Sequence, residues 1–352
     1  MKDRYDGLQR ETWSMPNGKQ KLALMEEMIR IADKYMTEEN AYDVRMDYTS
    51  ACLECGCSER MFISFSWCLS KFEKQPDQYS NFMIMWHYKW ILNQIWRFPQ
   101  FSVEQIERVF DDFREKCLKY GYSIRPYYQQ KVRLMLSQGK TQEAADYYQK
   151  WKAEKRDQLS DCKACEQNLF GQYYFALNHN KRGMQAIKPI LDGKVSCRSV
   201  PQNTYSHMIG PLLKLGEYEQ AVSIAGKAFR KLQGPEYLDE YGVFMEFFVV
   251  TDMKKAVKLY ERTIRLGLEC KVPWDRFKYL LSVRLFLQQW SQAKRRKTLL
   301  ESDTVTMEWL DNEISSLSAA FNARNGNDYV DRYISDKEAS LRRLIAAYQS
   351  RQ

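Results

Sequence analysis

The chain has 352 residues, of which 44% are hydrophobic, and its 54 lysines and arginines outweigh its 45 acidic residues to give a formal net charge of +9. Only 15 glycines and 9 prolines argue against glycine-rich all-β folds and long disordered linkers. The charge favours an acidic partner without by itself indicating nucleic acid. No uncharged apolar run approaches the ~20 residues that span a bilayer, so no membrane partner is expected.

Helical periodicity runs along nearly the whole chain and is broken by short turn signals. The first part is predicted to hold helices over 19–35, 41–55, 59–74 and 82–96, and a fifth that Ser102 caps with Gln105 three residues on. Regular helical hairpins follow from 126 to about 300, and two further helices cover 305–322 and 335–348. We therefore divide the chain into an irregular helical region (1–124), a repeat array (125–300) and capping helices (301–352).

A ladder of alanines sets the repeat. Ala186, Ala221, Ala256 and Ala293 lie 35, 35 and 37 residues apart, and Ala144 lies 42 residues upstream. A small residue is needed where the two helices of a hairpin cross closely. A period near 34 residues is typical of tetratricopeptide (TPR) helix-turn-helix units. The predicted fold is all-α: a right-handed α-solenoid of TPR-like repeats with irregular capping helices at both ends.

The longest step of the ladder contains an insertion with two cysteines. Cys162 and Cys165 stand at the start of one repeat, and Cys197 stands in the turn before the next, so the stacking of repeats should bring the three thiols together. Three convergent thiols suit a tetrahedral zinc site of structural type. The fourth ligand could be His207, Asp161 or water. Inert packing of the thiols is favoured over this metal site, and a redox-active disulfide is the least favoured of the three interpretations.

Signatures of enzymes are missing from the sequence. It has no G-x-x-x-x-G-K, G-x-G-x-x-G or H-E-x-x-H motif, and none of its 3 histidines stands in a recognisable nucleophile setting. We therefore expect a protein without enzymatic activity and with no required cofactor. The basic run 294–297 is interpreted as a solvated helix face near a C-terminus, where cations are favoured by the helix dipole.

The concave side of such an array is formed by the first helix of each repeat. With the ladder alanine at position twenty, positions two, five, nine, twelve and thirteen face inward. The predicted partner-binding residues are Gln129, Arg133, Asn168, Phe175, Asn178, His179, Asn203, Ser206, Lys214, Tyr241, Met245 and Lys278, with Asp275 as the single carboxylate. Amides can pair with a peptide backbone, and the cations suit acidic side chains or a free carboxylate.

Several motifs connect the chain to a known group of proteins. They are Phe65–Leu69 (FSWCL), Tyr88–Trp90 (YKW), Asp161–Glu166 (DCKACE), Gly216–Ala221 (GEYEQA) and Ala323–Gly326 (ARNG). With these motifs the whole chain resembles a family of bacterial proteins that contain tetratricopeptide repeats. The resemblance implies a bacterial cytoplasmic scaffold and supplies no activity. An N-terminus without the apolar core of a signal peptide, and nine cysteines, an odd number, also favour the cytoplasm.

Three functions fit these observations. The leading one is a scaffold or adaptor that binds a peptide segment of a partner protein in a concave groove. The second is a peptide-sensing receptor of the kind that Gram-positive bacteria build from similar repeats. The third is a nucleic-acid-binding solenoid, which rests only on net charge and aromatic content and is therefore the least favoured of the three.

Overall fold

The computed structural model describes residues 1–351 except 231, 233 and 293–297. Within the described residues the chain is all-α: it forms 17 α-helices, which pack as consecutive pairs in an α-solenoid, and no strand. Every helix in this part of the chain is too short or too polar to cross a membrane. Ala293 and the basic run 294–297 lie outside the described residues.

The helices before the predicted array are α1 (Lys2–Ser14), α2 (Lys19–Tyr35), α3 (Glu38–Glu54), α4 (Ser58–Lys74), α5 (Asn81–Ile95) and α6 (Val103–Lys119). The sequence patterns missed α1. The predicted capping box at the start of α6 is present, because Ser102 Oγ accepts from the backbone N–H of Gln105 at 3.2 Å and the Gln105 side chain accepts from the backbone N–H of Ser102 at 2.8 Å.

The array consists of α7 (Arg125–Ser137), α8 (Thr141–Ala153), α9 (Lys163–Ala176), α10 (Asn180–Leu191), α11 (Gln202–Lys214), α12 (Tyr218–Phe229), the short 3-10 turn η1 (Pro235–Tyr237), α13 (Leu238–Thr251), α14 (Met253–Glu269) and α15 (Pro273–Gln292). The chain ends with α16 (Met307–Asn325) and α17 (Tyr329–Gln349). The last helix begins six residues before its predicted start, directly after the turn that Gly326 makes with φ +65°.

The alanine ladder is correct at three positions and wrong at one. Ala144, Ala221 and Ala256 are fully buried on the second helices of their pairs. Ala186 is only partly buried, and Gly183 takes its place: a Cβ on Gly183 would lie 2.2 Å from the Phe175 ring. The second repeat of the array, α9 with α10, is therefore displaced by three residues from its predicted register, because glycine replaces alanine at its closest helix crossing.

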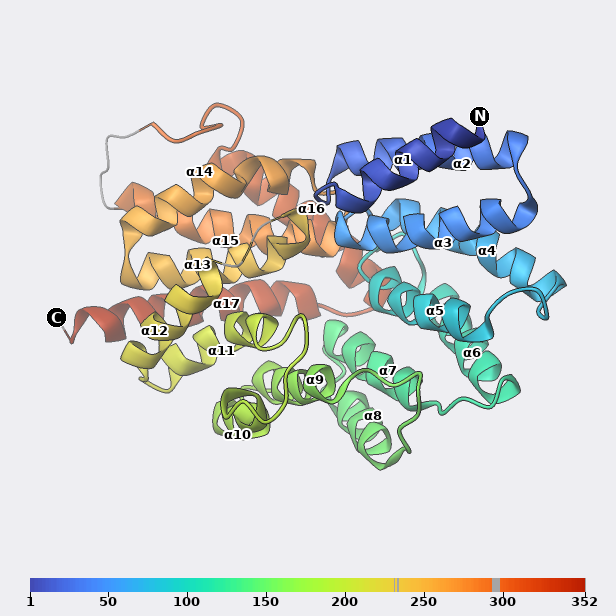
Figure 1. The fold of residues 1–352 in the computed structure, drawn as a ribbon. Helices are drawn as coiled ribbons and strands as arrows, with labels where there is room; N and C mark the ends of the chain where they lie inside the picture. Colours follow the sequence, from blue (N-terminus) through green and yellow to red (C-terminus); the bar gives the residue numbers. More distant parts are fainter. Residues whose placement is uncertain (231, 233, 293–297, 352) are drawn as a thin grey trace.

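The first and last parts of the chain meet (Figure 1). Arg97 pairs with Asp275 at 2.6 Å, and the backbone N–H of Trp274 donates to the carbonyl of Arg97 at 3.1 Å. Arg324 donates to the carbonyl of Trp96 at 2.6 Å. These contacts join α5 to α15 and α16, so the predicted concave side is closed into a ring instead of forming one long open groove.

The last helix covers part of the same concave side. In Figure 1, α17 is the red helix that runs past α13 toward the C-terminus beside α12. Tyr329 begins it beside Gly139, where an added Cβ would lie 2.3 Å from the tyrosine ring. Lys337 pairs with Glu246 of α13 at 2.5 Å, and Tyr348 contacts α12. These contacts cover concave surface that an external partner would otherwise reach.

Candidate functional site

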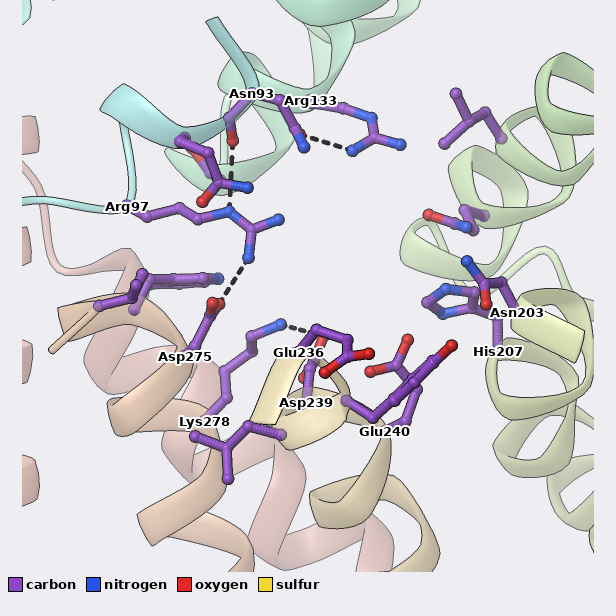
Figure 2. A pocket seen from close by; sticks show the side chains of 18 of the residues that line it. Asn93, Arg97, Arg133, Asn203, His207, Glu236, Asp239, Glu240, Asp275 and Lys278 are labelled. Atoms are coloured by element: carbon purple, nitrogen blue, oxygen red, sulfur yellow. Dashed lines mark hydrogen bonds and ion pairs between the residues drawn. The ribbon is translucent and has the colours of Figure 1, made fainter. Parts of the chain in front are cut away.

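A cavity of about 790 Å³ lies inside the ring. Its walls come from α5, α7, α9, α11, α13, α15 and α17, so residues from nearly the whole length of the chain face one space. The volume is within the range of cavities that hold small ligands, roughly 300–1,000 Å³. Figure 2 shows charged and amide side chains pointing into it from opposite sides.

The first side carries two arginines. Arg133 of α7 donates to Asn93 Oδ1 at 2.6 Å, and its buried Nε has no partner. Burial lowers the pKa of Arg133 to about 10, so the guanidinium still carries its charge at neutral pH. Arg97 is neutralised by Asp275. Arg133, in contrast, has no carboxylate of the described residues within ion-pair distance.

The opposite side carries carboxylates from the start of α13. Asp239 pairs with Lys278 of α15. Burial opposes ionisation of Asp239, but Lys278 and His207 outweigh it and lower the pKa to about 2. Burial and the neighbouring Asp239 raise the pKa of Glu240 to about 7. Glu240 forms no ion pair within the part of the chain that the structure describes.

Neutral polar groups lie between these two sides. His207 of α11 faces the cavity, and burial lowers its pKa to about 4, so its ring is neutral at neutral pH. Asn203 lies one helical turn before it and also lines the cavity. Asn168 of α9 has a buried carbonyl oxygen without a partner. These groups offer donors and acceptors for a ligand without adding charge.

Five of the twelve predicted partner-binding residues line this cavity: Gln129, Arg133, Asn168, Asn203 and Lys278. The predicted carboxylate Asp275 lines it as well.

The residues predicted on α9 show the effect of the wrong register. Phe175 packs against Gly183 of α10 and does not line the cavity. Asn178 and His179 lie at the turn between α9 and α10, beside a separate depression of about 430 Å³. Three residues earlier, at the corrected positions, Gln172 joins Asn168 in the cavity wall. A glycine in place of an alanine therefore accounts for the misplaced residues on α9.

The remaining four predicted residues are engaged elsewhere in the protein. Ser206 donates to the carbonyl of Asn203 at 2.9 Å, and Met245 is fully buried. Tyr241 is buried beneath Arg262 of α14, with 5.4 Å between cation and ring centre.

Lys214 lies outside the cavity. Its ammonium donates to Asn178 Oδ1 at 2.7 Å. Burial, together with Lys337 and Arg343 of α17, lowers its pKa. The C-terminal helix α17 therefore lies beside Lys214, and a partner that binds Lys214 must also contact or displace this helix.

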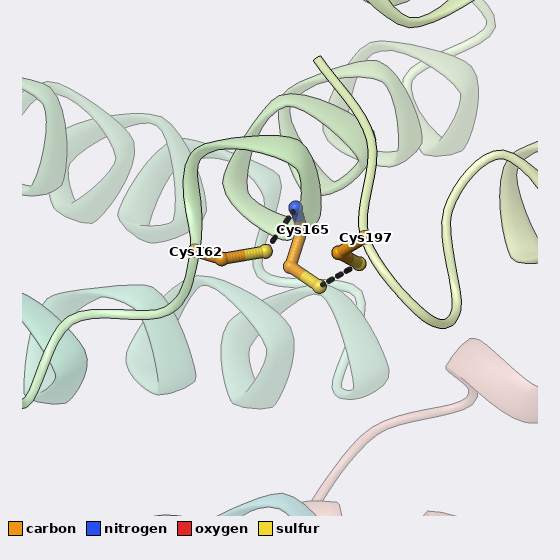
Figure 3. A group of neighbouring side chains, drawn as sticks. All are labelled: Cys162, Cys165 and Cys197. Atoms are coloured by element: carbon orange, nitrogen blue, oxygen red, sulfur yellow. Dashed lines mark hydrogen bonds between the residues drawn. The ribbon is translucent and has the colours of Figure 1, made fainter.

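The three predicted thiols do come together (Figure 3). The sulfur atoms of Cys162, Cys165 and Cys197 lie within 4.8 Å of one another, which is close enough to hold a metal ion. Cys165 Sγ and Cys197 Sγ are 3.6 Å apart. His207 does not belong to this group. Asp161 is engaged by Lys89 at 2.8 Å.

Buried ion pairs hold the insertion that carries these thiols. Arg125 of α7 binds both carboxylate oxygens of Glu166 at 2.9 Å, and Arg156 reaches the same carboxylate. Lys89 of α5 donates to the carbonyl of Leu159 at 2.7 Å. The segment before α9 is therefore fixed at several points, and Cys162 caps the helix by accepting from the backbone N–H of Cys165 at 3.4 Å.

Among the cavity residues that sequence reasoning missed, four polar ones belong to the site described above: Asn93, Arg97, Asp239 and Glu240. The first two belong to the irregular region, where no repeat register was available. Asp239 and Glu240 lie just before the inward position assigned to Tyr241, and a search for charged residues around each inward position would have found them.

No family model matches the chain, and no curated protein is significantly similar to it. We therefore infer the function from the chemistry of the cavity and of the thiol cluster.

Proposed function

We propose that the chain is a non-enzymatic binding protein, a scaffold or adaptor, that holds a short peptide or the terminal segment of a partner protein in the central cavity. One observation carries this proposal: a cavity of about 790 Å³ whose polar lining comes from α5, α7, α9, α11, α13 and α15. No set of side chains suited to bond-making was predicted, and the groups described above suit recognition.

The lining matches the chemistry of a peptide. Amides line the cavity on three helices, through Asn93 of α5, Asn168 of α9 and Asn203 of α11. Each amide can donate to a peptide carbonyl and accept from a peptide N–H. The indoles of Trp96 and Trp274, with ring centres 6.0 Å apart, add apolar surface for side chains. A mixed polar and aromatic lining is typical of sites that bind small flexible ligands.

The closure of the ring favours a chain end over an internal segment. An internal segment must enter and leave its site, whereas an end needs only one opening. The contact between Arg97 and Asp275 closes the array on one side, and α17 covers α13 on another. A short free peptide satisfies this geometry best, which favours the peptide-sensing receptor as the second candidate function.

We further propose that the thiol cluster holds a structural zinc ion. Its support is the convergence of three sulfur atoms from two segments, Cys162 with Cys165 and Cys197. Water would complete the tetrahedron, because Asp161 is already bound to Lys89 and Gln129. All nine cysteines lie in the described part of the chain and are free, which agrees with the proposed bacterial cytoplasm.

A binding assay tests the peptide proposal. The intact chain is mixed with random hexapeptides, separated by size-exclusion chromatography, and the retained peptides are identified by mass spectrometry. We expect a selected subset to be retained, and Arg133→Gln to lower retention at least about tenfold because it removes the free guanidinium.

The matched control is Arg265→Gln on the outer helix α14, where the arginine pairs only with Glu301 at the surface. This variant should retain the same amount of peptide as the unmodified chain. Failure to retain any hexapeptide would contradict the proposal, as would equal loss in both variants.

A further inference from the structure

Half of the ten charged residues that line the cavity are balanced within the protein. Three ion pairs account for these five residues: Arg97 with Asp275, Lys278 with Asp239, and Asp161 with Lys89, which lies behind the wall. Among the described residues in the interior of the cavity, this leaves one cation and one carboxylate without an opposite partner, Arg133 and Glu240. A buried charge without a partner is unfavourable, so a ligand that supplies the partner gains correspondingly in affinity.

These two groups lie on opposite sides of the cavity. Arg133 projects from α7 and Glu240 from α13, with open space between them in Figure 2. Arg133 is held by Asn93, and its Nε remains without a partner. Its planar guanidinium offers parallel donors for a carboxylate. Glu240 offers an acceptor for an ammonium group.

The exposed charged residues around the cavity reinforce this arrangement, in which the α13 side is negative and the α7 side is positive. Glu54 and Glu236 lie close enough to each other for Glu54 to raise the pKa of Glu236, after the larger effect of burial. With Glu240 they make one side of the cavity acidic, although Arg198 also lines it. An ammonium group is therefore favoured on the α13 side and disfavoured on the α7 side.

We propose that the cavity recognises both free ends of a short peptide, with the carboxylate bound by Arg133 and Asn93 and the ammonium group bound by Glu240. This inference rests on the proposed function and narrows its ligand to an unmodified peptide, because an internal segment has neither end. The partner of the site is then a released peptide, and a folded protein with a protruding tail is excluded.

The test uses one hexapeptide mixture in three chemical forms: with both ends free, with the C-terminus amidated, and with the N-terminus acetylated. The intact chain is exposed to each form under identical conditions. We expect the free form to be retained at least about tenfold more than either capped form, because each cap removes one charge-assisted contact. This comparison changes only the ligand, so it does not depend on how a variant folds.

Two variants assign each end. Arg133→Gln should lose the preference for a free carboxylate and keep the preference for a free ammonium group, and Glu240→Gln should do the reverse. Arg265→Gln on α14 and Glu308→Gln on α16 are exposed controls and should keep both preferences.

The outcomes separate this inference from the proposed function. Equal retention of free and capped peptides would overturn two-ended recognition and leave peptide binding standing. Retention of no peptide in any form would overturn both. Loss of both preferences in a single variant would overturn the assignment of one residue to each end.

Discussion

Arg97 and Asp275 form an ion pair across 2.6 Å, although 178 positions separate them in the chain. Both side chains are about four-fifths buried, at 18% and 20% exposure. Because Arg97 follows α5 and Asp275 begins α15, this pair joins the irregular N-terminal region to the last helix of the repeat array and forms part of the cavity wall. A solenoid in which each unit contacts only its neighbours stays open, and here it is closed by a contact between distant units.

Replacing Asp275 by asparagine should weaken this closure. The substitution leaves Arg97 without a compensating charge in a mostly buried position, so we expect the free energy of unfolding to fall by roughly 1–3 kcal/mol. Urea unfolding followed by circular dichroism measures it. Glu269→Gln breaks the exposed pair between Glu269 and Lys19 and should cost less than about 1 kcal/mol. Equal effects of the two substitutions would contradict the proposed role of Arg97 and Asp275.

The corrected repeat register predicts that Gly183 is intolerant of a side chain. Gly183→Ala should destabilise the protein by roughly 1–3 kcal/mol, since the new Cβ would lie 2.2 Å from the Phe175 ring. Gly226→Ala on α12 is the matched control, because nothing lies within 4 Å of its Cβ position. There the substitution should be neutral or stabilising by up to about 1 kcal/mol. A tolerated alanine at 183 would favour the original register with Ala186.

The raised pKa of Glu240 gives a signed pH dependence. Its pKa rises from 4.5 to about 7 on folding, so the folded state binds more protons between these values. Its contribution to stability therefore falls as the pH rises through this window and stays constant above it. Glu240→Gln should be more stable than the unmodified chain at about pH 8.5, by roughly 1–3 kcal/mol, and equal to it below about pH 4.5.

Thermal unfolding of both proteins across this range checks the prediction. The comparison of the two cancels the opposite dependence of His207, whose pKa burial lowers from 6.5 to about 4. The charges that face Glu240 are those of Asp239, Lys278 and Asp275, and they are the same in the unmodified chain and in the variant. If the stability difference between the two proteins grew toward acid pH instead, the prediction would be contradicted.

The thiol cluster predicts about one equivalent of zinc per chain in protein purified without added metal. Cys197→Ser removes one of three ligands and should lower the content to less than about a tenth of an equivalent after dialysis against a mild chelator. Cys57→Ser at the start of α4 is the control and should retain zinc. Elemental analysis measures the zinc content of each protein. An unmodified protein without zinc would contradict the metal site and indicate that the three thiols are only packed together.

The architecture was predictable because its signals are local. Turn residues such as Gly139 and Gly216, both with positive φ, recur at the same distance before the buried alanines, and the period follows from them. The convergence of Cys162, Cys165 and Cys197 was predictable because adjacent repeats stack. At the second repeat, Asn178 with φ +56° takes the turn position and Gly183 the crossing position. Because these two positions lack the glycine and the alanine of the other repeats, the glycine and alanine pattern does not reveal the register here.

The closure of the ring was not predictable in this way. Arg97 lies in the irregular region, and nothing in its neighbourhood indicates that it meets Asp275. The position of α17 over α13 depends on Lys337 and Glu246, whose pairing also has no local signal. Long-range contacts between non-neighbouring units carry no periodicity, so the sequence patterns led to one long open groove where the structure has a cavity lined by residues from both parts of the chain.

A crystal structure of the chain with the hexapeptide that it retains most strongly tests the central claim most directly. Binding inside the ring predicts electron density between α7 and α13, with the peptide carboxylate at Arg133 and its ammonium group at Glu240. Density on the outer surface, or at the depression beside His179 with the central cavity empty, would contradict it.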